Sequence, residues 1–221
     1  GFDAQILNNR FSLSVDYYNK SNEGILLVLP VPGTLGLQAP PQNAGRVDNK
    51  GWEFTLGSHN RFGQVGFDAT INLSINKNQV IDLAGTGPYI TGDDIDPRYI
   101  TAEGYPINSF WGYKTDGLFQ SEAEIQGYPV FMRAAKPGDV KVLDLTKDGK
   151  INADDMTYLG SPFPRYTFGS TFNVTYKGFA LNLFFQGAKD VGVRLARALA
   201  EQGNYEGFTH KIYTNNFWTP E

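Results

Sequence analysis

Apolar and polar residues alternate without a break from Val65 to Asn76. In an extended chain this period of two puts the apolar side chains on one face and the polar or small ones on the other. The run has twelve residues, whereas ordinary strands have about 5–6. At roughly 3.3 Å per residue and a tilt near 45° it spans roughly 28 Å, close to the apolar band of roughly 25 Å on outer-membrane barrels. The pattern predicts a strand that crosses a bilayer.

The same alternation recurs in other parts of the chain. It runs from Tyr166 to Tyr176 and, with Phe184 as an exception, from Phe179 to Gln186. Lys177-Gly178 between these runs predicts a tight two-residue hairpin turn. Aromatic residues gather at the ends of the runs, where the headgroup-level girdles of a barrel lie. Shorter alternating stretches cover residues 11–17 and 52–57.

The predicted connections between these runs differ greatly in length. Three are short, at residues 8–10, 59–64 and 177–178, and the long ones cover residues 19–50, 77–165 and 187 onward. Short turns at one rim and long loops at the other are typical of outer-membrane barrels, whose long loops lie outside the cell. We therefore predict an all-β fold, an antiparallel transmembrane β-barrel segment. The alternative is a soluble β-sandwich, for which shorter strands and turn signals every 8–12 residues are typical.

Short helices are predicted inside the long loops. Ser121 to Gln126 contains the Ser-x-x-Glu pattern of a capping box, which marks a helix start. Residues 193–202 also have a helical pattern, and Gly203 closes it.

Composition narrows the function classes. The chain has 221 residues, a net charge of −4 and no cysteine, so neither a disulfide framework nor a thiolate zinc site can form. Mild acidity gives no basis for nucleic-acid binding. Enzyme motifs are absent, His59 and His210 have no recognisable partner pattern, and we expect turn or surface roles for both. We predict that the protein is not an enzyme, and no catalytic or substrate-binding residue is assigned.

The sharpest chemical motif lies between residues 144 and 155, where the chain has the spacing of a calcium loop. Gly149 stands where such a loop turns sharply. Oxygen donors at alternating positions let a short loop surround one cation at about 2.4 Å. We predict a structural Ca²⁺, with Mg²⁺ as the second choice. The predicted ligands are Asp144, Thr146, Asp148, the backbone carbonyl of Lys150, Asn152 and Asp155.

Two departures distinguish this loop from the usual pattern. Thr146 stands where Asp or Asn is typical, and Asp155 has a shorter side chain than the usual Glu. The alternative is an Asp-Gly turn followed by a helical turn capped by Asn152, which needs no metal.

Several ordered stretches together resemble the SusC/RagA family of TonB-linked outer-membrane transporters. The match covers essentially the whole chain, from the opening Gly-Phe-Asp to the closing Phe-Trp-Thr-Pro. The stretches that carry it are residues 43–54 (Asn-Ala-Gly-Arg-Val-Asp-Asn-Lys-Gly-Trp-Glu-Phe), 104–120, 138–155, 160–169 and 176–187.

This resemblance implies a role beyond what periodicity indicates. Such proteins form barrels of about 22 strands with an N-terminal plug. They pair with a SusD-like surface lipoprotein and import oligosaccharides or peptides, driven by TonB. The resemblance covers only later strands and loops, so we expect residues 1–221 to be a partial barrel domain without the plug, the TonB-contacting N-terminal region or the final strand. The expected location is the outer membrane of a Gram-negative bacterium, in contact with its lipid.

Two functions from different classes follow. The first is a transporter wall in which polar side chains, among them Asp68, Asn72, Thr171 and Asn173, face the lumen. The second is a soluble β-sandwich that binds glycans and is stiffened by the calcium loop.

Overall fold

The computed structural model describes residues 1–28, 41–91, 98–130, 135–194 and 218–219. The chain divides into two compact units, and each is described by itself. The first is formed by residues 1–91, 99–109 and 160–192, and the second has residues 110–159 as its main continuous stretch. Among the described residues, no helix is both long enough and apolar enough to cross a membrane.

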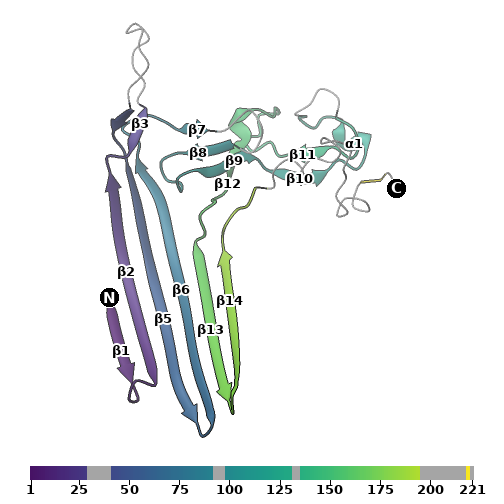
Figure 1. Ribbon diagram of the computed structural model, residues 1–221. Helices are drawn as coiled ribbons and strands as arrows, with labels where there is room; N and C mark the ends of the chain where they lie inside the picture. The colour runs from purple at the N-terminus through teal and green to yellow at the C-terminus, as the bar shows by residue number, and fades with distance from the viewer. Residues whose placement is uncertain (29–40, 92–97, 131–134, 195–217, 220–221) are drawn as a thin grey trace, which may run out of the picture. The chain divides into compact units, whose positions relative to one another are not determined.

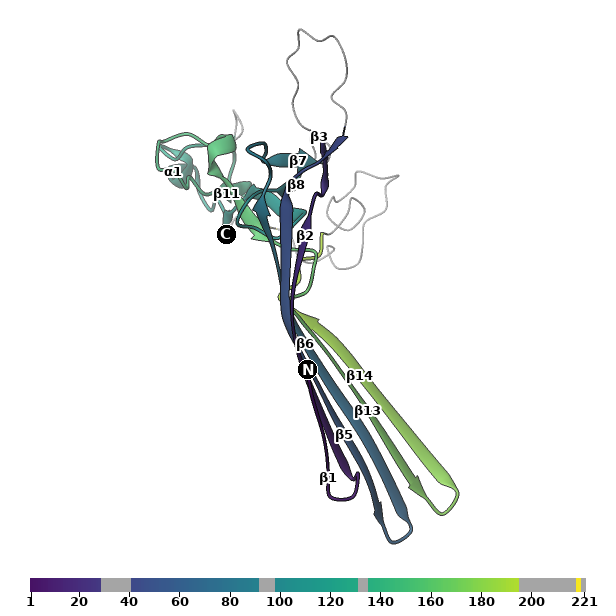
Figure 2. The same cartoon turned by 90° about the vertical axis from the view of Figure 1, so that its left-hand side faces the viewer.

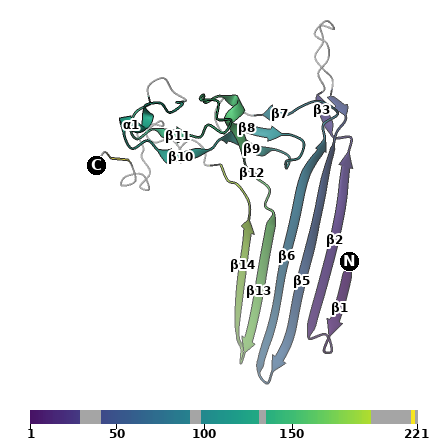
Figure 3. The same ribbon diagram turned by 180° about the vertical axis from the view of Figure 1, so that it is seen from behind.

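A six-stranded antiparallel sheet dominates the first unit (Figure 1). Its spatial order is β1-β2-β5-β6-β13-β14, and Figure 3 shows the same order from behind. Within the described residues the sheet does not close on itself, and β1 and β14 are its edges. The predicted antiparallel fold is confirmed. The strands are Phe2–Ile6 (β1), Phe11–Glu23 (β2), Arg46–Phe62 (β5), Val65–Asp82 (β6), Tyr166–Tyr176 (β13) and Phe179–Lys189 (β14).

Most of the strands are longer than the alternation predicts, whereas β13 has the predicted bounds. The predicted turn over residues 59–64 is wrong, because β5 continues to Phe62 and leaves only Gly63 and Gln64 in the turn. The polar residues that suggested a turn are paired across the ladder, as His59 is with Asp68. At the other end, β2 continues to Glu23 and β6 to Asp82.

The three short connections lie at the same end of the sheet (Figures 1 and 2). The predicted turn at Lys177-Gly178 is confirmed, and both residues have positive φ, 45° and 85°. That geometry is the one that matches the twist of a two-residue hairpin. The connection from Leu7 to Arg10 is closed by a hydrogen bond from the Arg10 N–H to the Leu7 carbonyl. The predicted separation into short and long connections is therefore present in the sheet.

Aromatic side chains cover two strand glycines. The Tyr18 ring lies over Gly51 on the neighbouring strand, and its hydroxyl donates to Asn76 Oδ1 at 3.0 Å. Phe168 covers Gly187 in the same way. Covering a glycine with a cross-strand ring fills the space that a side chain would take and fixes the register there.

A small buried core lies where β5 and β6 extend away from the short turns. Val47, Val80 and Leu83 are between 0% and 4% exposed, and Ile25 and Tyr89 are among the side chains that pack against them. Two small ladders belong to the first unit. They pair β3 (Leu26–Val28) with β4 (Pro41–Asn43) and β7 (Tyr89–Thr91) with β8 (Arg98–Thr101). The predicted long connection over residues 19–50 therefore contains a pair of short strands.

The second unit consists of short elements around a buried aromatic residue. Phe119 is 2% exposed and packs edge-on against Tyr128, with ring centroids 5.4 Å apart. The predicted helix start is confirmed: Ser121 caps α1 (Glu122–Ile125) and accepts the N–H of Glu124, while the Glu124 side chain accepts the N–H of Gln120 instead of that of Ser121. The helix predicted for residues 193–202 lies almost entirely outside the described residues. The other elements are β9 (Ser109–Tyr113), β10 (Thr115–Leu118), β11 (Val140–Val142), the 3₁₀ turn η2 (Ala153–Asp155) and β12 (Met156–Gly160).

Candidate functional site

The register of the six-stranded sheet sorts its side chains onto two faces. Most residues stand opposite one of the same class, so that Leu56 of β5 is aligned with Leu13 of β2 and Ile71 of β6. The next position along β5, Thr55, is aligned with Ser14 and Asn72. The alternation predicted strand by strand is therefore continuous across the sheet. A shift by one residue anywhere would mix the two faces.

The apolar face is open to its surroundings. Leu181, Leu183 and Phe185 of β14 are 54%, 41% and 56% exposed. In a soluble sandwich these side chains would be buried against a second sheet about 10 Å away. Exposure of this extent on a continuous apolar face is typical of a surface that contacts another apolar medium. It favours the predicted membrane-spanning sheet over the alternative of a soluble β-sandwich.

Aromatic residues bound the apolar face at both ends. The upper aromatic row, defined as Tyr17, Trp52, Ile75 and Tyr166, is aligned across four strands. Within it the rings of Tyr17 and Trp52 lie 4.9 Å apart. The lower aromatic row is defined as Phe62, Val65, Tyr176 and Phe179.

The distance between these two rows matches a bilayer. Ten residues separate Trp52 from Phe62 on β5. They span roughly 33 Å along the strand, or roughly 23–27 Å at a tilt of 35–45°. The apolar band of outer-membrane barrels is about 25 Å tall, so the sheet has the dimensions of a membrane-spanning wall.

The opposite face is polar and holds the residues predicted to line the lumen. Asp68 stands opposite Asn173, Thr70 opposite Thr171, and Asn72 lies on the same face. His59 Nδ1 contacts Asp68 Oδ1, which places this histidine within β5 instead of in a turn. His210 lies outside the described residues. The predicted common face of Asp68, Asn72, Thr171 and Asn173 is therefore present.

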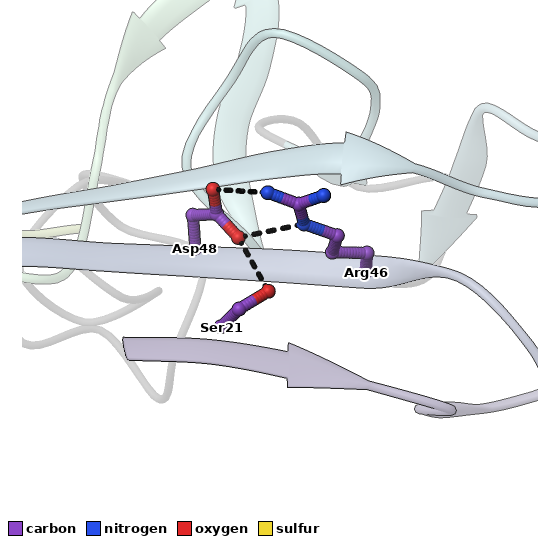
Figure 4. A network of polar contacts seen from close by, with 3 residues as sticks. All are labelled: Ser21, Arg46 and Asp48. Carbon is purple, nitrogen blue, oxygen red and sulfur yellow. Dashed lines mark hydrogen bonds and ion pairs between the residues drawn. The ribbon is translucent and has the colours of Figure 1, made fainter. Parts of the chain in front are cut away.

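A charged network that the sequence did not single out lies on the extended part of β5 (Figure 4). Asp48 is 5% exposed and accepts two hydrogen bonds from the Arg46 guanidinium, both at 2.9 Å. Ser21 Oγ on β2 donates a third at 2.8 Å. These hydrogen bonds lower the pKa of Asp48 to about 2, and the bond from Arg46 has the largest effect. The network joins β2 to β5 beyond the upper aromatic row.

The predicted calcium loop is held by its own hydrogen bonds. Asp155 is fully buried, and its Oδ1 accepts the N–H groups of Leu145 and Thr146 at 2.9 and 3.1 Å. Its Oδ2 accepts the Asn152 N–H at 2.9 Å, which completes a capping box with the Asn152 side chain. These hydrogen bonds lower the pKa of Asp155, the Asn152 and Thr146 N–H groups contributing most.

Asp144 and Asp148, two further predicted ligands, also accept hydrogen bonds within the loop. Asp144 Oδ2 accepts the Gly149 N–H at 2.9 Å, and Asp148 Oδ1 accepts the Lys150 N–H at 2.9 Å. Gly149 has a φ of 81°, as the sharp turn requires. Among the described residues no three Asp, Glu or His side chains converge as a metal site. The capped turn of the metal-free alternative is therefore present, and the bound ion stays a prediction.

Comparison with known proteins identifies relatives of this chain. No protein-family model matches it. TonB-dependent receptor P3 of Formosa agariphila is 33% identical over 198 residues, which cover 84% of this chain and 19% of the relative. TonB-dependent receptor P26 of the same organism is 32% identical over 225 residues, 99% of this chain and 22% of the relative. The chain thus spans about a fifth of the length of these curated relatives.

Solved structures show the same fold. A chain of the RagAB peptide importer in the open-open state superposes with a TM-score of 0.67 at 23% identity, covering 86% of this chain and 20% of that chain. The RagAB peptide transporter gives a TM-score of 0.65 at 22% identity. Receptors and transporters of this kind are not enzymes, in agreement with the absence of enzyme motifs. The chain belongs to the TonB-dependent receptors, of whose barrel it forms part of the wall.

Proposed function

We propose that this chain is part of the barrel wall of an outer-membrane transporter that imports nutrient oligomers, oligosaccharides or peptides, in a TonB-dependent manner. The observation that carries the proposal is the register-matched sheet with one exposed apolar face, one polar face and aromatic rows a bilayer apart. The apolar face contacts outer-membrane lipid, and the polar face lines the path of the substrate.

A surface lipoprotein of the SusD type and TonB are the proposed partners. Support for the lipoprotein comes from the resemblance to the SusC/RagA family, whose members pair with such a lipoprotein, and from the fold shared with a chain of the RagAB peptide importer. TonB would act through a part of the receptor outside these 221 residues. Both solute classes remain in the proposal, because the described polar face carries amides, hydroxyls and carboxylates that bind either one.

The orientation of the sheet is testable with one residue from each face. Ile71→Arg in the receptor that carries this chain puts a charge near mid-bilayer, between the two aromatic rows, and is expected to cost roughly 2–4 kcal/mol. Asn72→Ala, its neighbour on the polar face, is expected to have a mild effect. The measurement is the folded fraction in outer-membrane preparations, scored by heat-modifiable migration and by uptake of oligomers. Normal assembly of Ile71→Arg would show that this face does not contact lipid.

For the loop of residues 144–155 we propose a structural Ca²⁺, supported by the spacing of its oxygen donors. Binding would require Asp155 to exchange hydrogen bonds that it makes in the closed loop. The ion would hold a long loop in shape and take no part in transport chemistry.

The test is a calcium titration of the receptor, with protease cleavage of this loop as the readout. Resistance that rises with Ca²⁺, and does not rise in Asp148→Ala, is the expected result. Resistance that is the same with Ca²⁺ and with a chelator would remove the metal and leave the hydrogen-bonded turn as the complete explanation.

A further inference from the structure

We propose that the apolar face ends, beyond the upper aromatic row, in a binding site for an anionic phosphate-bearing lipid held by Lys50 and Lys77. The inference rests on the proposed function, because it requires this face to contact a bilayer. It adds a specific ligand class and specific residues to that contact.

The two lysines form a cross-strand pair of like charge. Lys50 on β5 stands directly opposite Lys77 on β6. Each lies two residues from the upper aromatic row, Lys50 before Trp52 and Lys77 after Ile75, so both lie on the apolar face. Both are exposed, and neither forms an ion pair with another described residue.

Like charges directly opposite each other destabilise an antiparallel pair. The Cβ atoms of two directly opposite residues are about 5 Å apart, so both ammonium groups can reach one phosphate. A bound anion between them would turn the repulsion into two charge-assisted hydrogen bonds. The pair is therefore better suited to an anion than to open water.

Further cations lie along the same end of the face. Lys189 stands opposite Tyr166 of the upper aromatic row, and the Arg165 guanidinium lies 5.4 Å from the centre of the Tyr166 ring. The carboxylate of Asp48, two residues beyond Lys50, is already bound by Arg46 and Ser21. Basic residues beside interfacial aromatic rings are placed at the depth of lipid headgroups.

A hollow on the same face offers a place for an acyl chain. Its volume is about 450 Å³, and small side chains at Ala4, Ser58 and Ala69 leave space between larger apolar neighbours such as Leu56 and Ile71. Leu56 lies four residues from Trp52 along β5, roughly 13 Å. One leaflet of a bilayer has an apolar depth of roughly 15 Å. A lipid whose phosphate is at Lys50 and Lys77 can therefore reach the hollow with its tail.

The experiment uses the complete receptor in lipid nanodiscs. Discs of phosphatidylcholine alone are compared with discs that contain phosphatidylglycerol, and retained lipid is counted by native mass spectrometry. The test variant is Lys50→Gln/Lys77→Gln. Its matched control is Lys20→Gln, which removes an exposed lysine of β2 that faces the polar side at the same level. Lys50→Arg/Lys77→Arg keeps the charge.

The expected result is retention of phosphatidylglycerol that falls by about tenfold or more in the double Gln variant. Two basic residues, each contributing about 1 kcal/mol near an anionic surface, correspond to a change of roughly 30-fold. The Lys20→Gln and double Arg variants should retain the lipid as the unaltered receptor does. Inorganic phosphate that competes fully with the lipid would show a free-anion site and overturn the proposal.

Two failures can be told apart. Equal retention of both lipids by an inserted receptor would overturn the lipid site and leave the barrel wall intact. A receptor that does not insert into the discs at all would overturn the proposed function, and the lipid site with it.

Discussion

At the scale of single residues, two buried carboxylates hold parts of the chain together by the same chemistry. Asp48 accepts hydrogen bonds from Arg46 and Ser21, and Asp155 accepts them from backbone N–H groups of its own loop. Hydrogen bonds to the charged form of a carboxyl group lower its pKa. The ionised form of each carboxyl group therefore stabilises the folded state. Asp48 does so by joining two strands, and Asp155 by holding its own loop.

The pKa of Asp48 predicts how its contact responds to acid. Because the folded pKa, about 2, lies below the unfolded value of about 3.9, the contribution to stability is complete above pH 4 and declines as the pH falls toward 2. The protection factors of the amides around Ser21 and Asp48, each taken relative to intrinsic exchange at the same pH, should therefore fall over this window. In Asp48→Asn the exchange should be fast at neutral pH and lose this acid dependence. An unchanged pH profile in that variant would assign the acid response to another group.

At the scale of elements, close contacts between strands fix the register. A Cβ at Gly51 would lie 2.5 Å from the Ile75 carbonyl oxygen and would displace the Tyr18 ring. A Cβ at Gly66 would meet only the Thr175 side chain, which can rotate away. The two glycines lie on the polar face of paired strands, so they form a matched comparison.

Gly51→Ala is expected to destabilise the sheet by about 1–3 kcal/mol, since a backbone atom cannot move away as a side chain can. Gly66→Ala should cost less. The urea concentration at which the heat-modifiable form is lost in detergent measures both. A Gly66→Ala cost equal to that of Gly51→Ala would show that the Ile75 carbonyl is not the source of the strain.

Local pattern was enough to predict the faces of the strands but not their ends. The period of two is local, so Val65–Asn76 and the Lys177-Gly178 turn were readable from neighbouring residues. The alternation fades beyond the aromatic rows, where the strands continue in contact with their neighbours and a small core forms around Val80. That continuation depends on pairing between segments far apart in the chain.

Local sequence pattern also predicted only part of the candidate site. The polar face follows from alternation, and the capped turn at Asn152 from a short motif. The Arg46, Asp48 and Ser21 network was missed because Ser21 meets Asp48 only through the β2–β5 register. The Arg46-x-Asp48 spacing, which puts opposite charges on one face of a strand, was the one local signal for it.

At the scale of the whole molecule, the six-stranded sheet depends on strands beyond the described ones. Within the described residues β1 and β14 have one neighbour each, and every unpaired backbone group at an edge in lipid costs several kcal/mol. Because barrels remove this cost by closing, the stability of the sheet belongs to the complete wall and not to these strands alone.

The 221 residues expressed alone are therefore expected to form no monomeric heat-modifiable species in detergent or in vesicles. Aggregates that pair through the two edges are the expected product, because exposed edge strands associate with one another. Electrophoresis with and without heating, and size-exclusion chromatography in detergent, measure this. The complete receptor, treated in the same way, is the positive control. A stable inserted monomer of the isolated chain would mean that its edges are satisfied within the chain itself, and that the apolar face does not need the rest of a barrel to enter lipid.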